Sequence, residues 1–211
     1  MGGHPMFLGK DDIQLGVNET LYDTSRVISC MTSCMVARVG PHSDVAVLAK
    51  HSSVPVINAL SNDYHPLQII ADFITIHEAF PSPLHTLSTV PSLGLEGMKI
   101  TWIGDSNNVL FDLAIGCLKL GVHISVASSK GYEIPQKMRD IILSSTEGVL
   151  QPGKLTETNV PEEAIKDADI LMTDTWVSMG QEEETTKRLK AFTGYQITNN
   201  LAKRGGPRHP P

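Results

Sequence analysis

A carboxylate, a hydroxyl and exposed backbone groups follow a predicted strand at residues 170–173, in the stretch TDTWVSMGQEEE. The carboxylate belongs to Asp174, the hydroxyl to Ser178, and the backbone groups to Met179 and Gly180. A free amino acid needs an acceptor for its ammonium group and donors for its carboxylate, and this set supplies both. The stretch therefore predicts a site for a zwitterionic amino acid. Helix capping gives no role to Trp176 or Met179, whereas the glutamates that follow suit the first turn of a helix.

The segment SNDYHPLQ, residues 61–68, supplies a second group of polar side chains at the start of a predicted helix. His65 and Gln68 are three residues apart, so they share one face of that helix. Helix N-termini attract anions, and these two side chains could hold a carbonyl oxygen or a phosphate. The alternative is a polar helix start with a hydrogen-bonded histidine.

Arg38 ends the apolar segment CMVARV and stays charged at physiological pH. It needs an anion, a carboxylate or water as its partner. A binding role and a simple surface position both fit this arginine.

The segment KITWIGDSNNVLFDLAIGCLKLG, residues 99–121, predicts a strand, a turn and a helix. Asp105 and Ser106 fall in the turn, and Asn107 and Asn108 at the helix start. Ligands of open α/β sheets bind at such strand ends. The segment lacks G-x-G-x-x-G, which weakens the hypothesis of a nucleotide-binding module. Capping of the helix by Ser106 and Asn107 is the favoured interpretation of this segment alone.

Short apolar segments alternate with helical patterns along the chain, which is typical of βαβ units. The sequence predicts an α/β protein of two Rossmann-like halves with mostly parallel sheets, the first half incomplete at its N-terminus. Strands are expected at residues 5–8, 35–39, 54–59, 99–103, 123–127 and 170–173. Helices are expected at residues 20–32, 43–51 and about 66–80.

Residues 80–97 contain three prolines and two glycines and interrupt this alternation. We therefore expect a first domain at 1–79 that includes the start of a linking helix, a linker at 80–97, a second domain at 98–200 and a tail at 201–211.

The composition excludes several classes of function. A net charge of −6 offers no basic face for nucleic acid, and no apolar run approaches the length of a membrane span. Three cysteines without C-x-x-C spacing argue against a disulfide framework or a zinc site and favour a reducing compartment. Cys30 and Cys34 are expected to pack as small apolar groups rather than to react. The first residues have no features of a signal or transit peptide.

Eight motifs together resemble ornithine carbamoyltransferases of the fungal mitochondrial type, in the family's order and approximate spacing. They are GGHPMFL, DIQLGVNE, ARV, HPLQIIADF, WIGDSNNV, KGYE, DADILMTDTWVSMGQEEE and GYQIT. HPLQ alone would indicate the wider aspartate/ornithine carbamoyltransferase superfamily, whereas DTWVSMGQE indicates the ornithine branch.

The resemblance implies transfer of a carbamoyl group from carbamoyl phosphate to L-ornithine, giving L-citrulline and phosphate, a step of arginine biosynthesis and the urea cycle. It implies no metal or redox cofactor, a homotrimer and the mitochondrial matrix. By matched position, three residues would hold and polarise carbamoyl phosphate: Arg38, His65 and Gln68. Others would hold ornithine, with residues 178–180 in a loop that closes over it: Asn108, Asp174, Ser178, Met179 and Gly180.

Two family motifs have no counterpart in the sequence: the Ser-x-Arg-Thr-Arg signature, which belongs before GGHP, and a His-Cys-Leu-Pro segment. The alternative expectation is therefore a truncated, catalytically impaired fragment that binds an amino acid or associates with full-length subunits. Such a chain, expressed as written, is expected in the cytoplasm.

Overall fold

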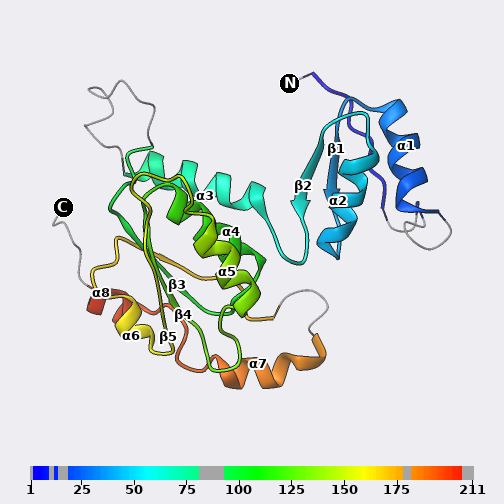
Figure 1. Ribbon diagram of the computed structural model, residues 1–211. Helices are drawn as coiled ribbons and strands as arrows, with labels where there is room; N and C mark the ends of the chain where they lie inside the picture. Colours follow the sequence, from blue (N-terminus) through cyan, green and yellow to red (C-terminus); the bar gives the residue numbers. More distant parts are fainter. Residues whose placement is uncertain (1, 10–11, 14–18, 81–92, 178–181, 206–211) are drawn as a thin grey trace. The chain divides into compact units, whose positions relative to one another are not determined.

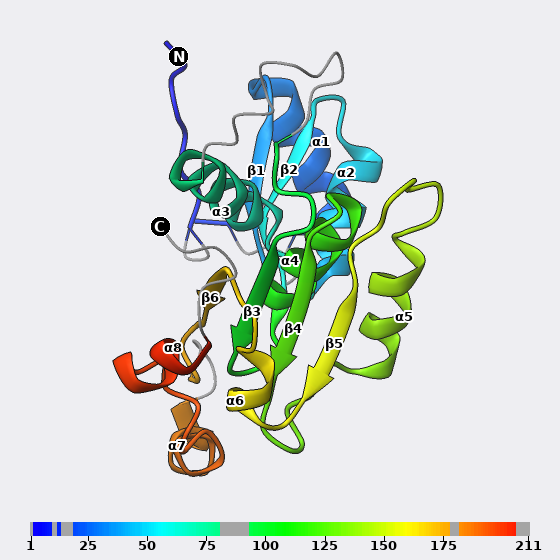
Figure 2. The same ribbon diagram turned by 90° about the vertical axis from the view of Figure 1, so that its left-hand side faces the viewer.

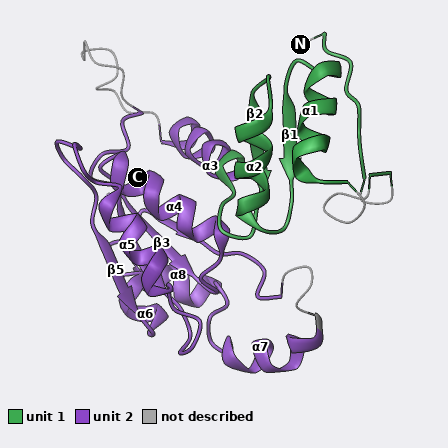
Figure 3. Cartoon of the chain, turned by 45° about the vertical axis from the view of Figure 1, so that its right-hand side comes forward, with its two compact units in different colours: residues 1–67 green, residues 68–211 purple. Residues whose placement is uncertain are grey.

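Two compact units make up the chain, Met1–Leu67 and Gln68–Pro211 (Figure 3). The computed structural model describes residues 2–9, 12–13, 19–80, 93–177 and 182–205 (Figure 1). The units divide within the first turn of helix α3 (Pro66–Ala79). The sequence predicts a linker further along the chain, at 80–97. Residues 81–92 of that segment lie outside the described ranges. The domain limits expected from the sequence stay a prediction.

The described residues of the first unit form two helices and two parallel strands before α3 begins (Figure 1). They are α1 (Leu21–Met31), β1 (Met35–Arg38), α2 (His42–His51) and β2 (Val56–Leu60). The buried Ser25 hydroxyl donates to the Leu48 carbonyl at 2.7 Å, so it ties α1 to α2. These elements confirm the helices and strands that the sequence predicts between residues 20 and 60.

The strand expected at residues 5–8 does not form. A strand needs a paired backbone and at least one buried face. Phe7, the largest apolar side chain of this segment, is 89% exposed, and the segment pairs with no strand among the described residues. This prediction is wrong because the apolar pattern has no surface to pack against.

The second unit contains a four-stranded parallel sheet in the order β5-β4-β3-β6 (Figure 2). The strands are β3 (Lys99–Ile103), β4 (His123–Ala127), β5 (Leu155–Thr158) and β6 (Ile170–Met172). The central strands β3 and β4 are almost wholly buried, as expected for a parallel sheet covered on both faces. The sequence analysis predicts three of these strands and misses β5, whose residues LTET are largely polar and half exposed at the sheet edge.

Helices cover both faces of this sheet. The elements after α3 are α4 (Asn108–Lys119), α5 (Gln136–Ser144), α6 (Pro161–Ala164), the 3-10 turn η2 (Glu182–Glu184), α7 (Thr185–Ala191) and α8 (Asn199–Gly205). The chain first moves outward from β3 to β5 and then returns to β6. Right-handed crossovers therefore put α4 and α5 on one face and α6 on the other. No helix within the described residues is long and apolar enough to cross a membrane.

The three cysteines differ in burial. Cys30 and Cys34 are exposed, so the prediction that they pack as small apolar groups is wrong. Their segment belongs to a unit with few elements, which offers them no second layer to pack against. Cys117, on α4, is fully buried, and this burial raises the pKa of its thiol.

We expect two of the three thiols to react with iodoacetamide at pH 8 in the folded chain. Cys30 and Cys34 are open to the reagent, whereas Cys117 is both shielded and held in its unreactive protonated form. Mass spectrometry of the alkylated chain measures the number of adducts, and alkylation in urea supplies the control with three. Three adducts without denaturant would contradict the burial of Cys117.

Candidate functional site

Arg38 and His65 both follow the parallel strands of the first unit. Arg38 is the last residue of β1 and lies opposite Leu60, the last residue of β2, after a register shift in the ladder. Its side chain is exposed and joins none of the ion pairs found among the described residues. His65 is half-buried and directly precedes α3. Both residues therefore lie at the carboxyl ends of these strands, where ligands of parallel sheets bind.

A small hydrogen-bonded turn holds the segment between β2 and His65. The Ser61 N–H donates to the Tyr64 carbonyl at 2.8 Å, and the Ser61 hydroxyl lies 3.0 Å from Nδ1 of His42. The Asn58 amide also donates to this hydroxyl at 3.2 Å. Because Ser61 is fully buried and hydrogen-bonded, this turn holds the backbone that leads from β2 to His65 in one conformation.

Gln68 lies in the first turn of α3 and belongs to the second unit. Its side chain is exposed, and Nε2 donates to Oδ1 of Asp72 at 2.9 Å, one turn further along the helix. The Gln68 amide is thus already oriented by its own helix.

Asp174 and the start of α4 meet in the second unit. Asp174 follows β6, and α4 follows the neighbouring strand β3, so the two segments share one edge of the sheet. Oδ1 of Asn107 accepts from the backbone N–H groups of Val109 and Leu110, which makes Asn107 the N-cap of α4. Its Nδ2 donates to Oδ2 of Asp174 at 2.8 Å. The capping interpretation is confirmed for Asn107, and the same side chain also holds a predicted site residue.

Ser106 and Asn108 flank this contact. The Ser106 hydroxyl lies 2.9 Å from the hydroxyl of Ser128 at the end of β4, so Ser106 joins two strand ends and does not cap α4. Asn108 is the half-buried first residue of α4, one position from the residue that contacts Asp174. The structure therefore brings Asn108 and Asp174, predicted from separate motifs, to the same strand ends.

A buried ion pair joins the segment after β3 to α7. Nη1 of Arg188 donates to Oδ2 of Asp105 at 2.7 Å, and both side chains are about nine-tenths buried. The same Nη1 donates to the Trp176 carbonyl at 3.1 Å, and the guanidinium lies 5.1 Å from the centroid of the Tyr132 ring. Arg188 Nε is 3.5 Å from the Glu184 carboxylate but without hydrogen-bond geometry. The sequence does not single out Arg188, since nothing in TTKRLKAF distinguishes it from the neighbouring charged residues.

Trp176 belongs to the apolar core of the second unit. Its ring is stacked on Phe192 with 5.9 Å between centroids and 15° between planes, and Phe192 is fully buried. Tyr195 packs edge-on against the same ring. Trp176, to which helix capping gives no role, therefore anchors the segment after β6 to the core. Ser178, Met179 and Gly180 lie outside the described residues.

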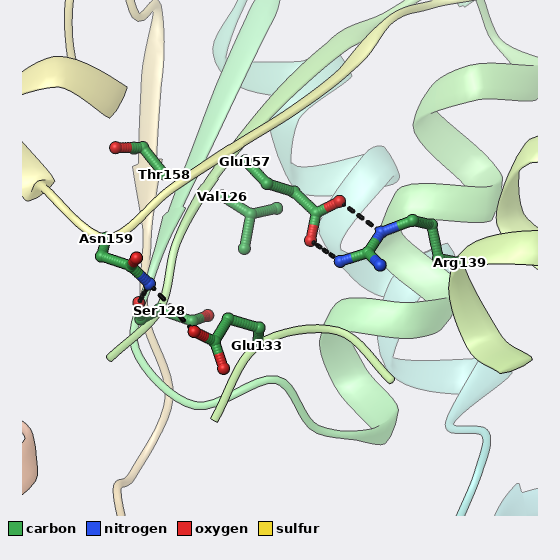
Figure 4. Close-up of a pocket in the computed structure, with 7 residues that line it drawn as sticks. All are labelled: Val126, Ser128, Glu133, Arg139, Glu157, Thr158 and Asn159. Carbon is green, nitrogen blue, oxygen red and sulfur yellow. Dashed lines mark hydrogen bonds and ion pairs between the residues drawn. The ribbon is translucent and has the colours of Figure 1, made fainter. Parts of the chain in front are cut away.

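A cavity of about 150 Å³, lined mostly by polar and charged residues, opens at the carboxyl ends of β4 and β5 (Figure 4). Arg139 and Glu157 form a bidentate ion pair there, with both N–O distances at 2.7 Å, and this contact raises the pKa of the Arg139 guanidinium. A hydrogen bond from its own backbone N–H lowers the pKa of the Glu133 carboxyl. None of the predicted site residues lines this cavity. The described residues contain no group of three or more His, Cys, Asp or Glu side chains arranged to hold a metal ion.

Two family models cover most of the chain. The model of the aspartate/ornithine carbamoyltransferase carbamoyl-P binding domain matches residues 1–78, and that of the Asp/Orn binding domain matches residues 96–209. With this match and the site geometry, the chain belongs to the aspartate/ornithine carbamoyltransferase family.

The similar proteins are ornithine carbamoyltransferases. The mitochondrial ornithine carbamoyltransferase of Emericella nidulans is 67% identical over the whole chain, which spans 61% of that protein. The crystal structure of the mitochondrial enzyme from Coccidioides immitis matches 98% of the chain with a TM-score of 0.85 and 61% identity, and 60% of its own length is covered. The enzyme from Pyrococcus furiosus matches with a TM-score of 0.83 at 38% identity, over 98% of this chain and 61% of its own. The chain thus spans about three-fifths of the relatives that it matches.

Proposed function

We propose that this chain acts as an ornithine carbamoyltransferase, which transfers the carbamoyl group of carbamoyl phosphate to the δ-amine of L-ornithine. The products are L-citrulline and phosphate, a step of arginine biosynthesis. The observation that carries the proposal is the Asp174 carboxylate, held at the edge of the sheet beside the start of α4, in a chain whose relatives bear this name.

Ornithine is assigned to the strand ends of the second unit. Asp174 accepts hydrogen bonds from the α-ammonium group, and Asn108 supplies an amide for the α-carboxylate or the ammonium. By their matched positions in the family motif, Ser178, Met179 and Gly180 complete this site. Fixing both α-groups aims the side-chain amine at its partner, which converts a bimolecular encounter into an oriented reaction.

Carbamoyl phosphate is assigned to Arg38, His65 and Gln68. The arginine supplies a permanent positive charge for the phosphate, and the imidazole and amide donate to the carbamoyl oxygen. As the amine attacks, this oxygen gains negative charge, and donors aimed at it stabilise the transition state. The bond from the carbamoyl carbon to the phosphate oxygen then breaks, phosphate leaves with the electron pair, and the attacking nitrogen gives up one proton to the phosphate or to solvent.

The wider assignments rest on the same relatives. We propose the mitochondrial matrix, since the fungal relatives are named as mitochondrial enzymes. We also propose the homotrimer that the family resemblance implies. We keep the domain limits at 1–79, 80–97, 98–200 and 201–211 as a proposal, supported by family-model matches at 1–78 and 96–209.

The test is ornithine-dependent formation of citrulline by the purified 211-residue chain, with Asp174→Asn as the key variant. Loss of a charged acceptor costs about 1.5–3 kcal/mol, so we expect the KM for ornithine to rise roughly 10- to 100-fold. The matched control is Asp140→Asn, because Asp140 also accepts from an amide, at 2.7 Å from Gln136, but lies on α5 outside the site. An unchanged KM in Asp174→Asn would contradict the assignment of ornithine to Asp174. Calorimetric binding of ornithine by a chain that forms no citrulline would favour the alternative of an amino-acid-binding fragment.

A further inference from the structure

We infer that Asn107 is a positioning residue that sets the Asp174 carboxylate for ornithine, an inference that rests on the proposed function. Asn107 is not among the residues assigned to ornithine or to carbamoyl phosphate. Its side chain joins the N-terminus of α4 to the segment that follows β6, two segments 67 residues apart in the chain. The oxygen of the Asn107 amide therefore caps α4, and its nitrogen donates to Asp174.

The orientation of the Asn107 amide follows from its neighbours. One end faces two backbone N–H groups, those of Val109 at 3.1 Å and Leu110 at 3.2 Å. Only the oxygen of an amide can accept from these donors, so the nitrogen must be the end that faces Asp174. Capping of α4 by the amide oxygen thus orients the Nδ2 donor of Asn107 towards Asp174.

The Asp174 carboxylate is held by both of its oxygens. Oδ2 accepts from Asn107 at 2.8 Å, and Oδ1 accepts from the backbone N–H of Thr175 at 2.7 Å. The preceding residue is also anchored, since the Thr173 hydroxyl donates to the Ile103 carbonyl of β3 at 2.6 Å. Each carboxylate oxygen has a further lone pair, so an ammonium group can be accepted without breaking either contact.

A neutral donor at this position has a specific advantage. Asn107 satisfies the carboxylate without neutralising it, whereas an arginine or lysine would compete with an incoming ammonium group as an ion-pair partner. Asn107 therefore presents Asp174 as an oriented, negatively charged acceptor.

Two substitutions separate positioning from capping. Ser, Asp and Asn are comparable N-cap residues, so Asn107→Ser and Asn107→Asp both preserve the cap of α4. The serine side chain is shorter and does not carry its donor as far towards Asp174 as the amide nitrogen does. An ionised aspartate has no donor and puts a second carboxylate beside Asp174. The expected Tm of both variants lies within about 3 °C of the wild-type chain.

The kinetic readout is the KM for ornithine against kcat in citrulline formation. Loss of one hydrogen bond to a charged group predicts a rise in KM of about tenfold for Asn107→Ser and a larger rise for Asn107→Asp, with kcat changed less. The matched control is Asn159→Ser, since Asn159 also donates to a carboxylate, that of Glu133 at 3.3 Å, in the same unit but outside this site. The control should leave the KM unchanged.

A second readout does not depend on turnover. Hydrogen exchange of the Thr175 N–H reports the order of the Asp174 carboxylate that it contacts. We expect about tenfold faster exchange at Thr175 in Asn107→Ser and no change in Asn159→Ser. Variants that match the wild-type chain in both KM and Thr175 exchange would overturn the inference and leave Asn107 as a cap alone. If the wild-type chain neither binds ornithine nor forms citrulline, yet Thr175 exchange rises only in the Asn107 variants, the positioning stands and the proposed function fails.

Discussion

Replacing Arg188 with methionine should destabilise the second unit by about 3–5 kcal/mol, which is the usual cost of removing one partner of a buried ion pair. Asp105 would remain about nine-tenths buried with its charged partner gone. Methionine fills similar space beside Tyr132 but offers no donor to Asp105 or to the Trp176 carbonyl. The loss of stability therefore comes from the uncompensated charge of Asp105 and the lost hydrogen bond to the Trp176 carbonyl, and little of it from a cavity.

Urea unfolding followed by fluorescence measures this effect, because both tryptophans lie in the second unit. The matched control is Arg139→Met. Arg139 and Glu157 make a bidentate pair at the same 2.7 Å distance, but their side chains are 30% and 26% exposed. Such partly exposed pairs contribute about 0–1 kcal/mol. Equal losses of stability in the two variants would contradict a structural role for the buried pair.

A companion variant separates charge from packing. Asp105→Asn combined with Arg188→Met removes both charges, so the double variant should recover part of the stability lost in Arg188→Met alone. If the double variant is less stable than Arg188→Met, the unpaired charge of Asp105 is not the source of the penalty.

Replacing Gly153 with alanine should cost about 3 kcal/mol or more, at the upper end of what overpacking costs. A Cβ atom there would lie 1.8 Å from the Val122 carbonyl oxygen and 3.1 Å from that of Cys117, and both are backbone atoms that no rotamer change can move. The Gly153 N–H donates to the Leu118 carbonyl at 2.9 Å, so the glycine also connects the last turn of α4 to the segment before β5. Alanine would therefore push this segment away and disturb the pairing of β5 with β4.

Thermal unfolding monitored by circular dichroism measures the cost. Gly40→Ala is the control, because a Cβ atom at Gly40 meets nothing within 4 Å and its φ is not in the left-handed region. A Tm for Gly153→Ala within about 2 °C of that control would contradict the close approach at Gly153.

Local patterns in the sequence predict the parts of the fold that depend on neighbouring residues. The apolar run and the asparagines of residues 99–121 predict β3, its turn and α4, and the structure confirms Asn107 as the cap. The same logic fails at residues 5–8 and at β5, where a strand depends on what lies beside it. An apolar pattern without a partner stays irregular, and a polar segment beside β4 becomes an edge strand.

The contacts behind the candidate site could not be predicted from local patterns. Asp105 and Arg188 are 83 residues apart, and neither motif shows that the other will be its partner. Trp176 illustrates the same limit, since its place in the loop gives no sign that it will be stacked on Phe192. Residue chemistry predicts the kind of ligand proposed for Asp174 and His65, and the resemblance to a family names the substrates. The positioning that we infer for Asn107 depends on hydrogen-bond geometry that no motif shows.

The choice of carbamoyl acceptor tests the central claim most directly, because the family includes enzymes for ornithine and for aspartate. The purified chain is incubated with carbamoyl phosphate and either L-ornithine or L-aspartate, and the carbamoylated product is quantified by mass spectrometry. We predict L-citrulline with ornithine, in equal amount to the phosphate released, and no carbamoyl aspartate. Carbamoyl aspartate as the main product, or no citrulline under conditions in which carbamoyl phosphate is stable, would contradict the account.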